Sequence, residues 1–270
     1  MFALDDLFSV KGRTALVTGG ATGLGRVAAE ALLAAGARVL IVSRKGPACE
    51  AVAAGLSAYG EVEGFGGTVA SEAGVLALAD EVRKRTDKLH ILVNNAGATW
   101  GEPFESFSFK AWERILSVNV AGLFTLTREM MPLLMASGSQ DHPASVINVG
   151  SVMGTVTQSE TAYSYSASKA AAHHLTRILA AEFTGRHVNV NAIAPGPFPT
   201  NMTKYAIGDE AGRERAAKSV PAGRVGRPED FAGTVLYLAG RAGAYTSGAI
   251  IPLDGGLSIA AAPPMFGEAH

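Results

Sequence analysis

Short apolar runs of strand length alternate along the whole chain with longer, alanine-rich segments of helical character. The expected strands are residues 14–17, 38–42, 61–65, 90–93, 145–149, 188–193 and 249–252. The expected helices are residues 24–35, 47–58, 72–85, 111–135, 163–183 and 228–238. Most strand runs are continuously apolar instead of alternating, which indicates burial on both faces. Strand–helix alternation with short links predicts right-handed crossovers and a parallel, doubly wound sheet.

The chain has 270 residues, and neither a linker nor a charge run divides it. We therefore expect one α/β domain over residues 1–270, with about seven parallel strands and helices on both faces of the sheet. The longest interruption of the pattern runs from Pro195 to Arg227. A segment of this kind at the carboxyl end of a strand is a candidate substrate lid, which we expect at about residues 197–218.

Charge and composition exclude several classes of protein. A net charge of -1 argues against a nucleic acid or an anionic membrane as the main partner. No apolar stretch approaches the length of a membrane span, and the acidic start of the chain is unlike a signal peptide. A single cysteine, Cys49, cannot form an internal disulfide and is expected to be inert packing. These features predict a cytoplasmic protein. No metal-ligand cluster is evident, and His173 and His174 are expected to serve packing or a subunit interface.

A glycine-rich turn, TGGATGLG from Thr18 to Gly25, directly follows the first apolar run. Glycines at this point let the chain turn tightly and bring backbone amides close to a phosphate, and the following helix adds its dipole. The turn alone is weak evidence, because many α/β turns need glycine. It nevertheless predicts a cradle for the pyrophosphate of a dinucleotide.

Tyr165 and Lys169 lie four residues apart in an expected helix, so they share one helical face. A phenol has a pKa of about 10, too high for easy proton exchange at neutral pH. A nearby ammonium favours the phenolate and lowers that pKa. The pair by itself is common on ordinary helices, but after the glycine turn it predicts an acid–base site.

These motifs, taken in order, resemble the short-chain dehydrogenase/reductase family over nearly the whole chain. The turn has the family's TGxxxGxG spacing instead of the general GxGxxG. Further matches are Asn94–Gly97 to the NNAG segment, Pro195-Gly196 with Thr200 to the segment that clasps the nicotinamide carboxamide, and residues 254–256 to a terminal DGG. The resemblance implies a Rossmann fold and hydride transfer between a nicotinamide dinucleotide and a carbonyl or secondary alcohol.

The resemblance also implies four catalytic residues, which are Asn119, Ser151, Tyr165 and Lys169. Tyr165 exchanges a proton with the substrate oxygen, and Ser151 holds that oxygen. Lys169 also bonds the nicotinamide ribose, and Asn119 holds a water that links the lysine to solvent.

The cofactor site implied in the same way is larger. Its residues are Gly19, Thr22, Gly23, Leu24, Gly25, Ser43, Arg44, Thr68, Val69, Asn95, Ala96, Gly97, Tyr165, Lys169, Pro195, Gly196, Phe198, Thr200 and Met202. One position departs from the pattern, because the usual aspartate that meets the adenine is replaced by Thr68-Val69. The threonine can still form a hydrogen bond there.

The end of the second expected strand indicates which dinucleotide binds. NAD-using members carry an aspartate there, whereas this chain has Ser43-Arg44-Lys45. A guanidinium forms charge-assisted bonds to a 2′-phosphate, each worth about 1.5–3 kcal/mol. The sequence therefore predicts NADP(H), although Thr22 stands where many NADP enzymes place a second basic residue.

The substrate is expected to be a small, apolar carbonyl or alcohol. The candidate pocket residues are Trp100, Met153, Tyr163, Phe198, Met202, Tyr205 and Ile207. The segments 98–101, 151–154 and 194–199 are most similar to rhamnolipid-associated bacterial 3-oxoacyl reductases. Sugar-acid, steroid or quinone dehydrogenases of the same family are alternatives. A different class, a non-catalytic NADP-binding redox sensor or scaffold, is disfavoured by the intact tyrosine and lysine.

We also expect a homotetramer. The helices from Ala111 and from Tyr163 carry small apolar faces, such as Ala170–Ala172, that permit close packing between subunits. The apolar run from Ile259 to Phe266 is expected to reach a neighbouring subunit.

Overall fold

The computed structural model describes residues 3–157 and 161–260. Within them, seven parallel strands form one sheet in the order β3-β2-β1-β4-β5-β6-β7. The strands are β1 (Thr14–Thr18), β2 (Arg38–Ser43), β3 (Val62–Gly66), β4 (Ile91–Asn94), β5 (Ala144–Val149), β6 (Val188–Pro195) and β7 (Ile250–Leu253). This arrangement confirms the expected doubly wound α/β fold. The strand order reverses between β1 and β4, and such a switch point opens a crevice at the carboxyl ends of the strands.

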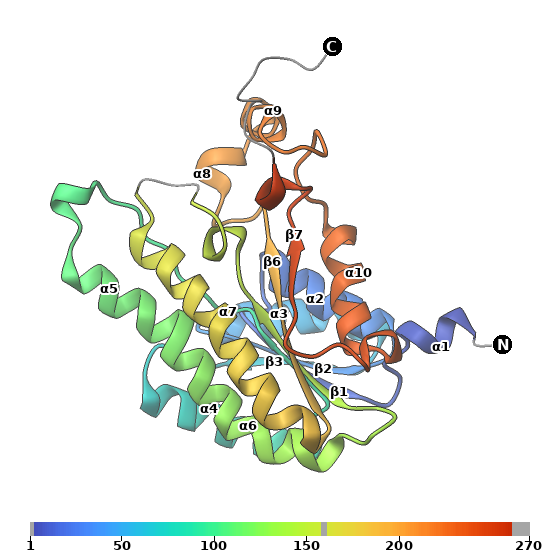
Figure 1. Cartoon of the computed structure of the whole chain (residues 1–270). Helices are drawn as coiled ribbons and strands as arrows, with labels where there is room; N and C mark the ends of the chain where they lie inside the picture. Colours follow the sequence, from blue (N-terminus) through green and yellow to red (C-terminus); the bar gives the residue numbers. More distant parts are fainter. Residues whose placement is uncertain (1–2, 158–160, 261–270) are drawn as a thin grey trace.

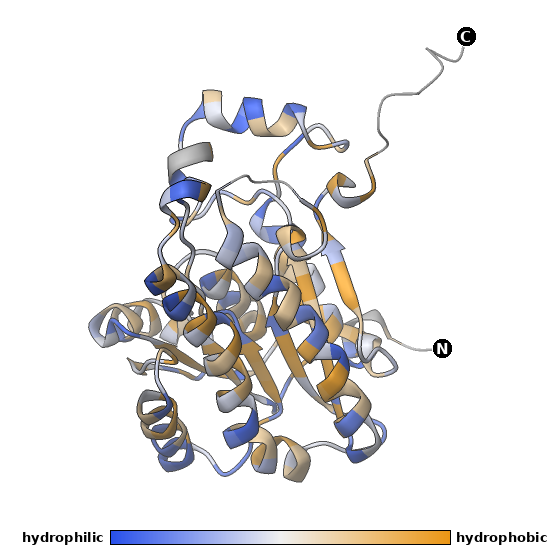
Figure 2. Cartoon of the chain, turned by 60° about the vertical axis from the view of Figure 1, so that its left-hand side comes forward, coloured by the Kyte–Doolittle hydropathy of each residue, from blue (hydrophilic) through white to orange (hydrophobic). Residues whose placement is uncertain are grey.

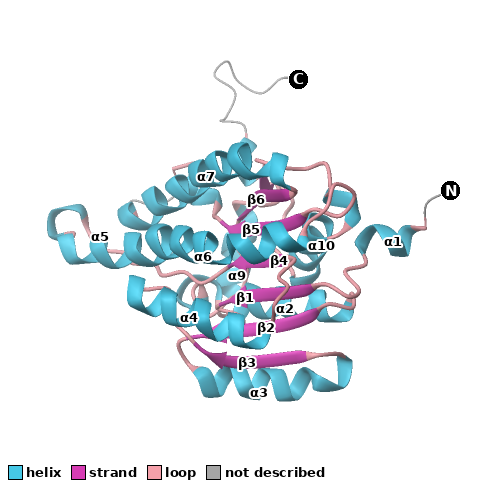
Figure 3. Ribbon diagram, turned by 90° about the horizontal axis from the view of Figure 1, so that it is seen from below, coloured by secondary structure: helices cyan, strands magenta, loops and turns pink. Residues whose placement is uncertain are grey.

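Helices cover both faces of this sheet (Figure 3). The main helices are α2 (Gly23–Ala34), α3 (Gly46–Leu56), α4 (Glu72–Arg85), α5 (Phe109–Leu116), α6 (Leu123–Ser137), α7 (Tyr163–Phe183) and α10 (Pro228–Ala239). Shorter helices are α1 (Leu4–Phe8), α8 (Lys204–Ile207) and α9 (Glu210–Lys218). Short 3-10 turns occupy Ser57–Tyr59, Phe104–Ser106, Val152–Gly154, Thr184–Arg186, Arg241–Gly243 and Leu257–Ile259.

Two apolar cores lie between the helices and the sheet. One packs α2, α3 and α10 against one face, with Leu32, Val39 and Phe231 fully buried. The other packs α4, α6 and α7 against the opposite face, with Leu40 and Met130 fully buried. Every residue of β1, β4, β5 and β6 is buried, so apolar residues occur on both faces of these strands; the polar side chains of Asn189 and Asn191 in β6 are buried as well. Figure 2 shows these strands as apolar elements beneath helices of mixed polarity.

The expected helix 111–135 is not a single regular helix. A π-helical segment, Ser117–Gly122, separates α5 from α6. It leaves no room for a side chain at Gly122, where a Cβ would overlap the carbonyl oxygen of Val69. Its buried residues are Asn119 and Gly122, and neither residue type distinguishes a π-helical turn from an α-helical one, so the sequence pattern does not reveal the segment. Segments of this kind are frequent at functional sites, and this one carries Asn119.

Residues 197–218, expected as a lid, contain the two short helices α8 and α9, which sequence periodicity missed. They lie together at the top of the molecule in Figure 1. The Asp209 carboxylate caps α9 by accepting a hydrogen bond from the Gly212 amide at 2.8 Å. In the described part of the chain, the helices lack the combination of length and apolar character needed to cross a bilayer.

Candidate active site

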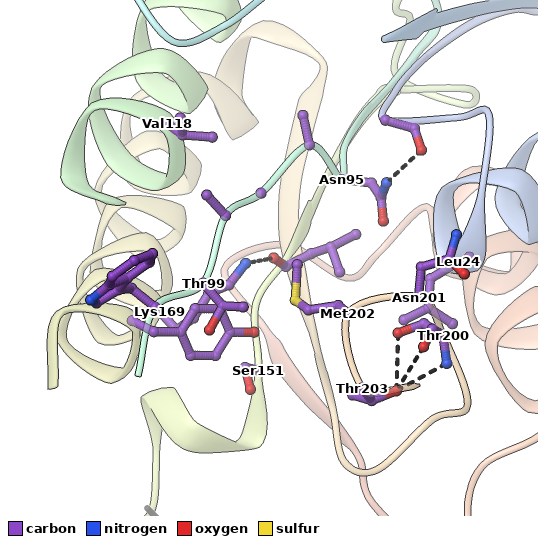
Figure 4. A pocket seen from close by; sticks show the side chains of 18 of the residues that line it. Leu24, Asn95, Thr99, Val118, Ser151, Lys169, Thr200, Asn201, Met202 and Thr203 are labelled. Atoms are coloured by element: carbon purple, nitrogen blue, oxygen red, sulfur yellow. Dashed lines mark hydrogen bonds between the residues drawn. The ribbon is translucent and has the colours of Figure 1, made fainter. Parts of the chain in front are cut away.

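A cavity of about 1460 Å³ opens at the carboxyl ends of the central strands. It runs past the glycine turn, the loop after β4, the start of α7 and the segment after β6. Figure 4 shows Lys169 and Ser151 near one end of this cavity and Leu24 and Thr200 near the other. All predicted catalytic and cofactor residues line the cavity except Gly25 and Asn119.

The glycine turn has the backbone that a dinucleotide cradle requires. Gly19 and Gly23 have positive φ angles of 66° and 56°, a region that favours glycine. Gly25 lies behind the cavity wall, where a Cβ would overlap the Asn95 side chain and the Gly19 carbonyl oxygen. Its role is therefore close packing of the turn. The turn leads into α2, whose N-cap Thr22 makes no side-chain cap, so the first amides of the helix face a site that suits a phosphate.

The loop after β4 is tied to the glycine turn by a small hydrogen-bond network. The Thr18 hydroxyl accepts from the backbone amides of Asn95 and Ala96, both at 3.0 Å. The Asn95 amide nitrogen donates to the carbonyl oxygens of Thr18 at 2.9 Å and of Gly19 at 3.2 Å. These bonds hold the glycine turn after β1 against the loop after β4. Thr18 is thus a structural member of the site that the prediction did not include.

The far end of the cavity is formed by the ends of β2 and β3. Ser43 and Arg44 both line it, and the Arg44 side chain is exposed. The Ser43 hydroxyl forms a hydrogen bond with the sulfur of Cys49 at 3.0 Å, and this cysteine is fully buried and forms no disulfide. Thr68 and Val69 also lie on the wall. The Thr68 hydroxyl accepts a hydrogen bond from the Ala70 amide at 3.2 Å, so part of its bonding capacity is used within its own loop.

Tyr165, Lys169 and Ser151 meet on one side of the cavity. The Lys169 ammonium nitrogen lies 5.6 Å from the centroid of the Tyr165 ring. It donates a 2.7 Å hydrogen bond to the carbonyl oxygen of Val149, the last residue of β5. Ser151 follows two residues later, and its hydroxyl accepts from the Met153 amide at 3.2 Å. Helix α7 and strand β5 therefore bring the phenol, the ammonium and the hydroxyl to one place.

Burial changes the acidity of this ammonium. Lys169 is 6% exposed, and burial lowers its pKa from 10.5 to about 8. Desolvation is the cause, because a charged amine loses its water shell inside the protein. Perturbed pKa values of this kind cluster at functional sites.

Asn119 is buried beside the site instead of on its wall. Its side-chain oxygen accepts from the Ala98 amide at 2.8 Å, and its nitrogen donates to the Ala98 carbonyl oxygen and the Ser168 hydroxyl, both at 2.9 Å. A Cβ built on Gly97 would lie 3.5 Å from the Asn119 oxygen and 3.8 Å from the Lys169 nitrogen. The amide thus joins the loop after β4 to α7, close to the lysine. Ser168, not predicted, is the partner on α7.

The segment after β6 contributes Pro195, Gly196, Phe198, Thr200 and Met202 to the wall. Its shape depends on an unpredicted residue, Thr203, whose hydroxyl donates to the Phe198 carbonyl oxygen at 2.6 Å and accepts from the Thr200 amide at 2.9 Å. Such local hydroxyl bonds are typical of threonine before a short helix. The only sequence signal was the spacing of the two threonines.

The predicted substrate pocket is partly wrong. Trp100, Met153, Phe198 and Met202 line the cavity. Tyr163 does not, because its ring packs edge-on against Phe104 and Phe107, with centroids 5.8 and 5.3 Å away. Ile207 also lies off the wall and is buried. The side chain of Tyr205 lies outside the described residues. Helix α5 supplies three wall residues that the prediction missed, Lys110, Glu113 and Arg114, because their exposed polar pattern resembles any solvated helix face.

A doubly wound sheet with a glycine turn, a Tyr–Lys pair and a serine around one cavity defines a nucleotide-dependent oxidoreductase. A family profile described as enoyl-(acyl carrier protein) reductase matches residues 19–258. The chain belongs to the short-chain dehydrogenase/reductase family, whose members use NAD(P).

Particular relatives are similar over almost their whole length. The rhamnolipids biosynthesis 3-oxoacyl-[acyl-carrier-protein] reductase of Pseudomonas aeruginosa is 47% identical, over 93% of this chain and 98% of that protein. The structure of the RhlG/NADP active-site complex from Pseudomonas aeruginosa is 46% identical with a TM-score of 0.91, covering 94% and 99% of the two chains. A gluconate 5-dehydrogenase from Burkholderia cenocepacia in complex with NADP and tartrate is 30% identical with a TM-score of 0.87, covering 96% and 100%.

Proposed function

We propose that this protein is an NADP(H)-dependent enzyme that interconverts a ketone and a secondary alcohol, with 3-oxoacyl thioesters as its substrates. One observation carries the proposal most strongly: the ammonium of Lys169, anchored on Val149, lies 5.6 Å from the Tyr165 ring in a cavity that Ser151 also lines. An acid–base phenol, a cation that tunes it and a hydroxyl that can hold an oxygen are the groups that carbonyl reduction needs.

The residues of the cavity fit a nicotinamide dinucleotide. The turn from Gly19 to Gly23 and the start of α2 would hold the pyrophosphate, and Asn95–Gly97 would flank the adenosine half. Lys169 and the segment from Pro195 to Thr200 would hold the nicotinamide half. When bound, the cofactor supplies or accepts the hydride. The glycines without room for a Cβ, and the hydrogen bonds that lock Asn95 to the turn, support this assignment.

In reduction, the Tyr165 hydroxyl transfers its proton to the carbonyl oxygen as negative charge develops there. Ser151 donates a hydrogen bond to the same oxygen. The Lys169 ammonium stabilises the phenolate that remains, and its bond to Val149 keeps it in place. Asn119 holds the loop after β4 next to the lysine, and in the proposal it also positions the water through which the proton is replaced. In oxidation, Tyr165 accepts the proton from the alcohol.

Selectivity for NADP(H) is assigned to Arg44. It stands at the carboxyl end of β2 on the cavity wall and forms no ion pair with another described residue. Its guanidinium is therefore available to a 2′-phosphate, with which it can form charge-assisted bonds. Relatives of known structure with bound NADP, among them the two described above, support the same cofactor.

Trp100, Met153 and Met202 give the cavity wall apolar surface beside the charged residues of α5, and such surface suits an acyl chain better than a polyol. The identity of 47% to a 3-oxoacyl-[acyl-carrier-protein] reductase supports the same substrate class. Oxidation of a sugar acid is a second candidate, since a gluconate 5-dehydrogenase shares the fold over 96% of this chain.

The test is a matched substrate panel with the purified protein. NADPH oxidation is followed with 3-oxoacyl thioesters of increasing chain length, and reduction of NADP is followed with gluconate and with secondary alcohols of similar size. Rapid reduction of the thioesters is expected, with little turnover of gluconate. Preference for the sugar acid would replace the proposed substrate. The absence of hydride transfer across the whole panel would favour the non-catalytic sensor or scaffold.

A homotetramer in the cytoplasm is part of the proposal. Phe109, Leu116 and Phe124 on α5 and α6, and Ile178 on α7, are large apolar side chains that remain exposed in one subunit. Such a surface suits contact between copies of the chain. Of the C-terminal run, Ile259 is exposed and residues 261–266 lie outside the described part. The free, buried Cys49 suits a reducing compartment. Light scattering at micromolar concentration is expected to give the tetramer mass, and a monomer would contradict it.

A further inference from the structure

A buried histidine, His173, lies directly behind the turn that carries Ser151. It follows Tyr165 and Lys169 on the same face of α7, at the next four-residue step. The side chain is 4% exposed and is absent from the cavity wall, so it cannot touch a substrate. It therefore has no direct part in the chemistry proposed above.

The imidazole ring fits against two glycines that bracket Ser151. A Cβ built on Gly150 would overlap Nε2 of His173 and lie 2.7 Å from its Cδ2. A Cβ built on Gly154 would lie 2.8 Å from its Cε1. Any side chain at either position would collide with the ring. The ring thus packs against bare backbone on both sides of the serine.

The turn between these glycines is also held by backbone hydrogen bonds. The Gly150 amide donates to the Ile193 carbonyl oxygen at 2.7 Å, and the Thr155 and Val156 amides donate to the Val152 carbonyl oxygen at 2.9 and 3.0 Å. Ser151 itself accepts two of the bonds within the turn, from the Gly154 amide to its carbonyl oxygen at 2.9 Å and from the Met153 amide to its hydroxyl at 3.2 Å. On the α7 side, the Lys169 ammonium holds Val149, and the His173 ring fills the space behind residues 150 and 154. Helix α7 therefore contacts the chain on both sides of Ser151. Lys169 forms a hydrogen bond to the residue before the turn, and His173 packs against the glycines that flank the serine.

The His173 ring is uncharged in its position behind the turn. Burial, followed by the charges of Lys169 and Arg177, lowers the pKa of His173 to about 4, so the imidazole is neutral at physiological pH. A second cation beside Lys169 would disfavour the charged ammonium. The Nε2 atom has no hydrogen-bond partner among the described residues. Burying a nitrogen without a hydrogen bond is unfavourable. The favourable interaction that the structure shows for this ring is its packing against the turn.

We propose that His173 is a positioning residue whose ring holds the turn 150–154, so that the Ser151 hydroxyl is aimed at the substrate oxygen. The inference rests on the role of Ser151 in the proposed function. It concerns the geometry of that serine and not the binding of the cofactor, because the ring contacts the turn and not the cradle.

The test is a double-mutant cycle between His173→Ala and Ser151→Ala. Turnover, KM for a 3-oxoacyl thioester and NADPH affinity are measured for both single variants and the double variant, at enzyme concentrations high enough for the slow forms. When Ser151 is intact, His173→Ala is expected to lower kcat by about tenfold or more, since small misplacements of a catalytic group slow the reaction strongly. In the Ser151→Ala background, the same change is expected to cost less than about twofold, because coupled residues are not additive. NADPH affinity is expected to stay unchanged.

Other results would overturn the inference. An equal loss in both backgrounds, or no loss in either, would mean that His173 does not act through Ser151. Full turnover by Ser151→Ala alone would contradict the proposed function of that serine, and this outcome is seen before His173 is changed. His174→Ala, an exposed neighbour on α7, is the matched control and is expected to behave as the unchanged protein. If His173→Ala does not fold, His173→Leu retains most of the volume and is expected to show a smaller loss with the same non-additivity.

Discussion

The Lys169 ammonium donates a 2.7 Å hydrogen bond to the carbonyl oxygen of Val149, at the point where β5 ends and the turn to Ser151 begins. This bond joins α7 to the end of β5, the two elements that build the proposed acid–base site. It orients a buried cation towards the Tyr165 ring and, at the same time, holds the strand end from which the serine projects. The chemistry of the site therefore depends on the protonation of one lysine.

Activity is expected to fall as the pH rises through about 8. Burial lowers the pKa of Lys169 to about 8, so the ammonium is present below that pH and lost above it. Without the charge, the phenolate of Tyr165 loses its stabilising partner. The measurement is kcat/KM for thioester reduction against pH, which reports the free enzyme. In Lys169→Arg, whose guanidinium stays charged, residual activity should lack this fall. A flat profile through pH 8 to about 10 in the unchanged protein would contradict the assignment.

The same lysine should make stability depend on pH in the alkaline range. Its pKa is lower in the folded protein, about 8, than the ordinary value of 10.5. Between these values the unfolded chain holds a proton that the folded protein has released, so this residue's contribution to the free energy of unfolding rises with pH. Denaturant titrations across that window should show the rise, and Lys169→Met should remove it. The same rise in the variant would assign it to other groups.

Arg44 is expected to select the phosphorylated cofactor. Arg44→Ala should weaken NADPH binding by roughly tenfold or more, because a charge-assisted contact to the 2′-phosphate is lost, and should leave NADH binding nearly unchanged. Direct binding titrations of both cofactors measure this. Arg26→Ala is the matched control, since Arg26 is exposed on α2 and pairs with Glu30 away from the cavity wall. Equal weakening of both cofactors, or a preference of the unchanged protein for NADH, would refute the role.

Met202 is expected to contact the acyl chain of the substrate. It lines the cavity and is 41% exposed, so a substrate would cover its apolar surface. Met202→Ala should raise KM more for long than for short 3-oxoacyl chains, since each buried methylene is worth about 0.8 kcal/mol. Met135→Ala is the control, because Met135 lies on α6 away from the cavity. It should leave KM unchanged for both long and short 3-oxoacyl chains. A penalty independent of chain length would show that the segment 197–218 does not contact the tail, and sugar-acid chemistry would gain support.

The sequence predicted the strands and the main helices to within a few residues, because buried parallel strands and amphipathic helices leave strong local patterns. It missed the π-helical segment at Asn119, because the residue types in Ser117–Gly122 do not distinguish a π-helical turn from an α-helical one. It also missed α8 and α9, which are too short to show a helical hydrophobic period. In the site, the order of motifs indicated the residues that meet at the cavity. Tyr163 was placed wrongly because proximity in sequence to Tyr165 does not show that its ring turns towards Phe104 and Phe107. The packing of His173 against Gly150 and Gly154 joins residues about 20 positions apart and required the structure.

The most direct test of the account compares Tyr165→Phe with Tyr163→Phe. Both changes remove one hydroxyl from the first turn of α7, but only Tyr165 lines the cavity. Turnover of a 3-oxoacyl thioester with NADPH is measured for each, with NADPH affinity and the melting temperature as checks on folding. Tyr165→Phe is expected to lose turnover by at least about 100-fold, the low end for a general acid, with cofactor affinity retained. Tyr163→Phe is expected to remain active. Near-normal turnover by Tyr165→Phe would contradict the proposed mechanism.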